Sequence, residues 1–230
     1  NKKPSSFSLM PRQEKGTRSS SAIPYQLYAD GKLSDDKRSV EVYFAAKNEI
    51  FGERAAGSPF NVYAETGRDL VVRNYAVTAG AQLKDQWRLS DFQNNIYHLK
   101  INGPNGFFRE FRGNPHDPAI NISLEYARGK GNSKQPTGNI ELQLRNLDRD
   151  RSFTIEIKDN AYGAANLKKV VGKAASGKEN ISIPLNLHKS YGWYDLTIRI
   201  AGVDTFEKRY AGHVETGVTS RTDPAMGNIL

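Results

Sequence analysis

The chain has 230 residues, and none of them is cysteine. This absence excludes disulfide bonds, metal sites with thiolate ligands and catalysis by a thiol nucleophile. It does not indicate a cellular compartment, because many exported bacterial proteins carry no cysteine either. The chain also lacks any apolar run of about 18 residues, the length that a membrane-spanning helix requires.

Catalytic motifs are absent as well. The four histidines, His98, His116, His188 and His213, follow none of the HxH, HxxxH or HExxH spacings of metal sites. No GxSxG, Walker or GxGxxG-plus-helix motif occurs. We therefore expect no catalytic residue, no metal ion and no cofactor in this chain, and no turnover by the chain alone.

Positive charge exceeds negative charge, and the formal net charge is +8. Such an excess suggests nucleic acid as a partner, but its distribution argues against that partner. Residues 1–21 carry five basic side chains and one acidic side chain, which gives +4, whereas residues 22–113 carry 12 basic and 11 acidic side chains, which gives +1. Because half of the excess lies in one short polar segment, we expect no nucleic-acid partner.

A strand-like alternation marks residues 97–113, which read YHLKINGPNGFFREFRG. Tyr97, Leu99 and Ile101 alternate with polar residues, the pattern of a half-buried strand. The GPNG segment that follows supplies the positive φ of a tight turn, and a second alternating run ends at Gly113. The pattern predicts a β-hairpin.

Residues 194–212, YDLTIRIAGVDTFEKRYAG, repeat this arrangement. Tyr194, Leu196 and Ile198 correspond to the alternating apolar residues of the first copy, and Gly212 corresponds to its terminal glycine. The two copies are roughly one hundred residues apart, which suits a small sandwich domain. Nearly every other apolar segment has a period of two. We predict an all-β fold with two tandem β-sandwich domains related by an internal repeat.

Composition predicts the domain boundaries. Residues 1–21 are rich in Ser, Lys, Arg and Pro, and we expect them to form a linker that stays outside the sandwich cores. Residues 22–113 form the first repeat and residues 117–216 the second, with a proline-rich break between them. Residues 217–230 are expected to form a polar tail.

A few side chains are candidates for surface contacts. These candidates are Arg12, Lys15, Arg18, Trp193 and His213. The three basic residues carry the charge of the N-terminal segment, while exposed aromatic rings suit a sugar or lipid-headgroup surface. For the two ring residues, core packing or a local turn role is the alternative interpretation. A carbohydrate-binding tandem sandwich is the alternative function, and Trp87 exposed on one face with Trp193 would favour it.

Short motifs in a fixed order run along almost the whole chain. They are MPRQE at residues 10–14, AVTAG at 76–80, NGPNGFFR at 102–109, GWYDL at 192–196, AGHVETG at 211–217 and DPAMG at 223–227. In this order they resemble the C-terminal region of bacterial phosphocholine-preferring phospholipases C, where a paired β-domain follows the catalytic domain. The resemblance thus identifies residues 1–21 as the linker from a catalytic domain that precedes them.

The resemblance implies a secreted or periplasmic parent enzyme that hydrolyses phosphatidylcholine, with sphingomyelin as an alternative substrate, and releases phosphocholine. In that family the nucleophile and the metal ligands lie in the catalytic domain, so no catalytic residue carries over to this chain. The implied partners are the catalytic domain of the same polypeptide and a membrane surface that contains phosphatidylcholine. We expect a non-catalytic accessory region that docks to one of these two.

Overall fold

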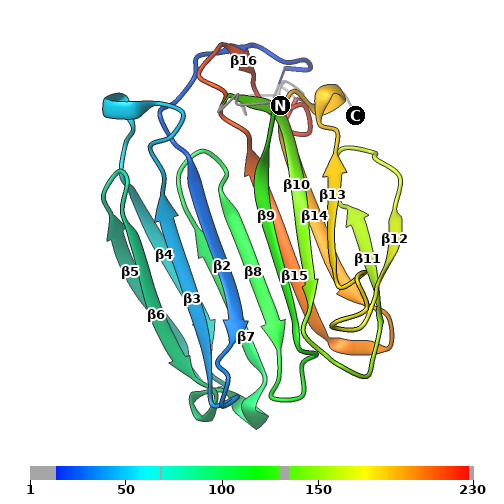
Figure 1. Ribbon diagram of the computed structural model, residues 1–230. Coiled ribbons are helices and arrows are strands. Elements are labelled where there is room, and N and C mark those ends of the chain that lie inside the picture. Colours follow the sequence, from blue (N-terminus) through cyan, green and yellow to red (C-terminus); the bar gives the residue numbers. More distant parts are fainter. Residues whose placement is uncertain (1–13, 68, 130–134, 228–230) are drawn as a thin grey trace, which may run out of the picture.

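The computed structural model describes residues 14–67, 69–129 and 135–227, and in these ranges the chain is all-β (Figure 1). The strands form an eight-stranded sheet, two three-stranded sheets and one two-stranded pair. The other regular elements in these ranges are short 3₁₀ helices, and no helix there is long and apolar enough to cross a membrane. The expected fold class is therefore confirmed.

The first repeat is a two-layered sandwich. Its strands are β2 (Leu27–Leu33), β3 (Ser39–Ala46), β4 (Ser58–Glu65), β5 (Leu70–Val77), β6 (Gln82–Arg88), β7 (Tyr97–Asn102) and β8 (Phe108–Gly113), with the 3₁₀ helices η1 (Gly52–Arg54), η2 (Leu89–Asp91) and η3 (Gln93–Asn95). One layer has the strand order β2-β3-β6, and the other has β8-β7-β4-β5.

The second repeat has the same strand order. Its elements are β9 (Ile120–Arg128), β10 (Pro136–Asn146), β11 (Phe153–Asp159), β12 (Leu167–Val171), β13 (Asn180–Leu185), η4 (His188–Ser190), β14 (Trp193–Ile200) and β15 (Val203–His213). One layer is β9-β10-β13, and the other is β15-β14-β11-β12. Each strand thus has a counterpart seven strands earlier in the chain, as an internal repeat requires.

The two predicted hairpins are equivalent. In the first, β7 pairs with β8 so that Tyr97 lies opposite Gly113. In the second, β14 pairs with β15 so that Tyr194 lies opposite Gly212. The period-two pattern therefore predicted the strands of both hairpins and the equivalence of the two copies, because alternation fixes which residues face the core.

The two sandwiches share one sheet, which the sequence analysis did not foresee. Strand β8 pairs antiparallel with β15, and this joins the two four-stranded layers into the order β12-β11-β14-β15-β8-β7-β4-β5. Glu110 lies opposite Arg209 at the centre of this junction. Figure 1 shows β8 and β15 side by side in the middle of the molecule. The tandem domains are therefore continuous, and each covers an edge of the other.

Alternating apolar residues fill the space between the layers. Leu99 and Ile101 of the first hairpin are buried, as are their counterparts Leu196 and Ile198. These side chains belong to one cluster of buried residues that includes both repeats. The free energy gained by removing this apolar surface from water is the main force that holds the layers together.

The N-terminal segment and the C-terminal tail meet at one end of the molecule. Strand β1 (Ser19–Ser20) pairs antiparallel with β16 (Ser220–Arg221), and the Gly16 N–H donates to the Gly227 carbonyl over 2.9 Å. Residues 1–13 lie outside the described residues, so the expected linker character of residues 1–21 remains a prediction there. The described part lies against the tail (Figure 1).

Candidate functional site

The end of the molecule that carries the β1–β16 pair gathers most of the candidate residues. We call this end the terminal face and define it by β1, β16, Asn105, Tyr191, Trp193, His213 and Val218. It lies at the top of Figure 1, where β14 begins and β15 ends. Segments from both repeats, from the N-terminal region and from the tail contribute to it. It is therefore the place where parts of the chain that lie far apart in the sequence come together.

His213 is the centre of this face and is buried rather than exposed. Its Nδ1 lies 3.0 Å from Oε1 of Glu215, and its Nε2 lies 3.2 Å from Oγ of Ser220 and 3.0 Å from the Tyr191 carbonyl oxygen. These contacts hold the start of the tail against the second repeat. The structure thus gives His213 a local packing role, and its surface contact remains a prediction that its burial does not favour.

Glu215 connects the end of the second repeat to two distant segments. Its Oε2 accepts the backbone N–H of Ile23 over 3.2 Å, and its Oε1 accepts the Asn105 side-chain amide over 2.7 Å. The carboxylate is almost fully buried, so each of these bonds replaces water that burial removes. Glu215 is not among the candidates predicted from the sequence, and its position inside the AGHVETG motif is the signal that could have indicated it.

Trp193 is half-buried and lies beside His213, with their ring centroids 4.7 Å apart. Its indole N–H donates to the Arg221 carbonyl over 2.9 Å, so the ring fixes β16 in place. A Cβ at Gly106 would lie 3.2 Å from the Trp193 ring, and Gly106 has a φ of +71°. The turn of the first hairpin therefore needs glycine here on two grounds, backbone conformation and close approach.

The remaining predicted residues are placed differently. Lys15 and Arg18 are exposed beside the terminal face, and the Arg18 side chain pairs with Glu14. Arg12 lies outside the described residues. Trp87 is 1% exposed, so it offers no ring for a surface shared with Trp193. The condition that would have favoured carbohydrate binding is not met.

A groove of about 690 Å³ runs across the terminal face. It is lined by Tyr191, Val218 and Ser19 among others. Two of these side chains are large apolar groups left open to solvent, since Tyr191 is 43% exposed and Val218 is 65% exposed. Exposed apolar groups gathered around a groove are typical of surfaces that contact another protein domain or a ligand.

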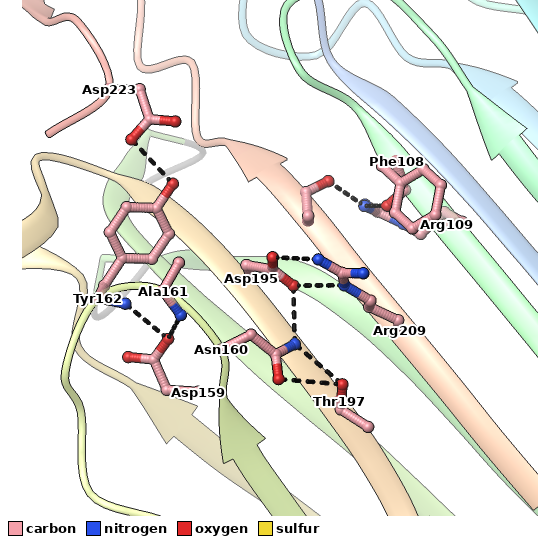
Figure 2. A network of polar contacts seen from close by, with 11 residues as sticks. Phe108, Arg109, Asp159, Asn160, Ala161, Tyr162, Asp195, Thr197, Arg209 and Asp223 are labelled. Carbon is pink, nitrogen blue, oxygen red and sulfur yellow. Dashed lines mark hydrogen bonds and ion pairs between the residues drawn. The ribbon is translucent and has the colours of Figure 1, made fainter. Parts of the chain in front are cut away.

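A second cavity, of about 610 Å³, opens at the same end of the second sandwich. Tyr162, in the loop between β11 and β12, lines it and donates its hydroxyl to Asp223 Oδ1 over 3.1 Å (Figure 2). Burial, followed by the charge of Asp223, raises the pKa of Tyr162, so its hydroxyl stays protonated and remains a donor. The cavity wall and the tail are therefore joined by a hydrogen bond that the sequence analysis did not predict.

Polar contacts on the outer face of the large sheet brace this wall (Figure 2). Arg209 makes two hydrogen bonds to Asp195, at 2.8 and 2.6 Å, and Asn160 donates to Asp195 over 2.9 Å. Burial disfavours the charge on Asp195, but the hydrogen bonds from Arg209 and Asn160 outweigh it and hold its pKa below the ordinary value. Asp195 is therefore an ionised structural anchor at neutral pH.

The titratable groups described here are engaged in structural contacts. Within the described residues, no group of three or more His, Asp or Glu side chains is arranged to hold a metal ion. The geometry is suited to binding another domain or a ligand at the end of a rigid sandwich.

Sequence comparisons with known proteins agree with the division of the chain into two repeats. A sequence model of the family described as bacterial phospholipase C, C-terminal domain, matches residues 19–114 and 118–213. Similar proteins include a non-hemolytic phospholipase C of Pseudomonas aeruginosa, 29% identical over 98% of this chain, and one of Burkholderia pseudomallei, 33% identical over 97%. A hemolytic phospholipase C of Pseudomonas aeruginosa is 33% identical over 94%. The chain spans only 30–31% of the length of these relatives.

The family match falls on the two structural repeats, and the region matched covers most of the chain. The resemblance drawn from the motifs is thereby confirmed. The chain belongs to the family of bacterial phospholipase C C-terminal domains.

Proposed function

We propose that this chain is the non-catalytic accessory region of a secreted phospholipase C, and that it docks against the catalytic domain of the same polypeptide through the terminal face. The names of the relatives support the parent activity, and the small share of their length that the chain spans supports an accessory role. By the motif resemblance, the parent would hydrolyse phosphatidylcholine and release phosphocholine.

One observation carries the docking proposal. The described N-terminal residues are anchored at the terminal face by the β1–β16 pair, so whatever precedes them is held close to this face. Tyr191 and Val218 leave apolar surface open at the same place. The anchored chain and the open apolar surface therefore lie at the same end of the molecule.

The experiment uses the full-length phospholipase C that carries this region, assayed on phosphatidylcholine vesicles and on a soluble phosphocholine ester. The test variant is Tyr191→Ser with Val218→Ser. The control is Leu147→Ser with Val170→Ser, which removes exposed apolar side chains away from the terminal face. If the face docks to the catalytic domain, the test variant alone should lose activity on both substrates or lose heat stability.

Contact with a lipid surface is the other role that the assay distinguishes. A loss on vesicles with an unchanged rate on the soluble ester would assign the terminal face to membrane contact and overturn docking. An unchanged rate on both substrates would show that the face contacts neither. A truncated enzyme without this chain provides the reference for the largest effect expected.

A further inference from the structure

The end of the second sandwich at which the 610 Å³ cavity opens is covered differently from the corresponding end of the first. In the first repeat, the connection from β6 to β7 carries Leu89 and Phe92, which are each 3% exposed and close that end of the core. In the second repeat, the connection from β13 to β14 places Leu187 inward but leaves Tyr191 at the surface. The second sandwich therefore stays open where its counterpart is filled.

The interior of this cavity is apolar. Its walls come from both layers of the sandwich and from the loop between β11 and β12. Apolar lining residues are Ile157, Ala165, Leu167, Leu185, Leu187 and Leu196. A volume of this size is within the range of about 300–1,000 Å³ that small-molecule sites occupy. A ligand that fills this cavity must therefore have an apolar part, which would contact the side chains left uncovered at this end of the core.

The rim of the cavity carries one side chain of each charge, Lys189 and Asp159. His188 and Lys189 of η4 line the opening and are exposed to solvent. Asp159 also lines it, but its carboxylate accepts the backbone N–H groups of Ala161, Tyr162 and Ala164 at 3.0, 3.0 and 2.7 Å. Figure 2 shows this carboxylate turned toward the loop backbone. Asp159 keeps its charge but directs its oxygens into the loop, so Lys189 is the charged side chain of the rim that can reach the head of an incoming ligand.

We propose that this cavity binds a single-chain amphiphile with an anionic head, the chain lying between the two layers and the head beside Lys189. An alkyl phosphate and a fatty carboxylate share this chemistry. Burial of the chain supplies most of the affinity, because each methylene removed from water adds to the free energy of binding. The lysine then selects the sign of the head, since opposite charges attract across a partly desolvated rim.

The binding test uses the 230-residue chain and three probes that share one alkyl chain, each below its critical micelle concentration. Dodecyl phosphate and dodecanoate distinguish a phosphate head from a carboxylate head, and dodecyltrimethylammonium reverses the charge. Isothermal titration should show saturable binding of at least one anionic probe, and binding at least tenfold weaker of the cationic probe. Absence of saturable binding, or equal binding of both charges, would overturn the proposal.

Two matched pairs of variants locate the site. Ala165→Trp fills the cavity and should reduce affinity for the anionic probes at least tenfold, whereas Ala201→Trp, in the turn that follows the far end of β14, should leave it unchanged. Lys189→Glu should weaken the anionic probes and strengthen the cationic one, whereas Lys173→Glu should do neither. Thermal unfolding of each variant shows that it is folded. Equal effects within either pair would place the ligand elsewhere.

Discussion

Arg109 and Lys208 occupy the same position in the two hairpins: Arg109 lies opposite Ile101 in the first, and Lys208 lies opposite Ile198 in the second. Both are buried, at 1% and 5% exposure. They lie on β8 and β15, the strands that join the two sandwiches. The junction between the repeats is therefore built around a pair of buried cations related by the internal repeat.

Each cation faces an aromatic ring of the other repeat. Arg109 lies opposite Tyr210 with its guanidinium carbon 5.2 Å from the ring centroid, and Lys208 lies opposite Phe111 with its Nζ 5.3 Å from that centroid. Carbonyl oxygens complete the surroundings, because Arg109 donates to Ala211 over 2.7 Å. Buried charge is tolerated here because hydrogen bonds and ring faces replace its lost hydration.

Lys208 provides a direct test of this junction. Its Nζ donates to Asp30 Oδ1 over 2.7 Å and to the Ile122 carbonyl over 2.8 Å. Lys208→Met keeps most of the volume but removes both bonds, and should lower the free energy of unfolding by about 1–3 kcal/mol. Urea unfolding of the variant and of the wild-type chain measures this change in the free energy of unfolding. Lys168→Met, which removes an exposed pair with Glu156, is the control, and an equal loss in both variants would contradict the junction's role.

Gly113 is required by packing rather than by backbone conformation. A Cβ there would lie 2.0 Å from Asp117 Oδ2 and 2.5 Å from the Tyr97 hydroxyl, which itself donates to Asp117 over 2.7 Å. Gly113→Ala should therefore lower the free energy of unfolding by about 1–3 kcal/mol, the usual effect of overpacking. The same substitution in an Asp117→Ala background should have a smaller effect, because the clash is relieved. Additive losses in this double-mutant cycle would refute the explanation.

One ring from each hairpin, at corresponding positions four residues before Phe111 and Tyr210, tests the repeat itself. Phe107 and Phe206 are both buried, at 6% and 4% exposure. Phe107→Ala and Phe206→Ala should each lower the free energy of unfolding by about 3–5 kcal/mol, the range for buried aromatic side chains. Chemical denaturation of the two variants checks this, and a loss below about 1 kcal/mol in either would show that its ring contributes little to the core.

The alternation that predicted the hairpins also indicates the limit of sequence reasoning. Phe107, Arg109 and Phe111 share one face by period two, and the structure buries all three. The burial of Arg109 among rings is explained only by the neighbouring strand β15, whose pairing with β8 depends on the register between the repeats. Local alternation does not encode such a register.

The candidate site was predictable only in part, because some of its residues act through long-range contacts. Trp193 and His213 could be selected from the sequence, because an aromatic and a titratable side chain flank residues 194–212. Glu215 and Tyr162 gain their roles from segments far along the chain, Ile23 in one case and Asp223 in the other. Side chains that act through long-range contacts leave no periodic signal, so the terminal face had to be seen in the fold.

His98 should make stability depend on pH. Its Nε2 lies 2.6 Å from Glu110 Oε1 and its Nδ1 lies 3.1 Å from Glu65 Oε2. The hydrogen bond to Glu110 raises the pKa of His98 above its ordinary 6.5, and the same bond lowers the pKa of Glu110 below its ordinary 4.5. The pair is therefore charged over a wider pH range in the folded state than in the unfolded state.

The sign of the effect follows from these two shifts. The contribution of His98 is complete below its unfolded pKa and is lost as pH rises through its higher folded pKa. The contribution of Glu110 is present above its unfolded pKa and is lost as pH falls through its lower folded pKa. His98→Gln should thus destabilise by up to about 1 kcal/mol near pH 5.5 and by less near pH 8.5, as for a partly exposed pair. Urea unfolding at both pH values measures this, and a pH-independent difference would contradict it.

The charged N-terminal segment should contribute to domain docking through its side chains. Its backbone is held, because the Arg18 N–H donates to Thr222 Oγ1 over 3.0 Å, while the side chains of Lys15 and Arg18 remain exposed. Replacing Arg12, Lys15 and Arg18 together by Gln in the full-length enzyme should lower activity equally on phosphatidylcholine vesicles and on a soluble phosphocholine ester. Acidic groups of the catalytic domain would then have lost their partners.

The matched control removes the same charge from the far edge of the large sheet and its adjoining loop, as Lys168, Lys169 and Lys173 replaced by Gln. These lysines are exposed on or next to the edge strand β12, and their loss should leave both rates unchanged. A loss on vesicles alone, weakened by salt because exposed charges are screened within about 10 Å at 0.1 M ionic strength, would instead mean contact with lipid phosphates. No loss on either substrate would make the segment a passive tether, and docking would then depend on the apolar groove of the terminal face alone.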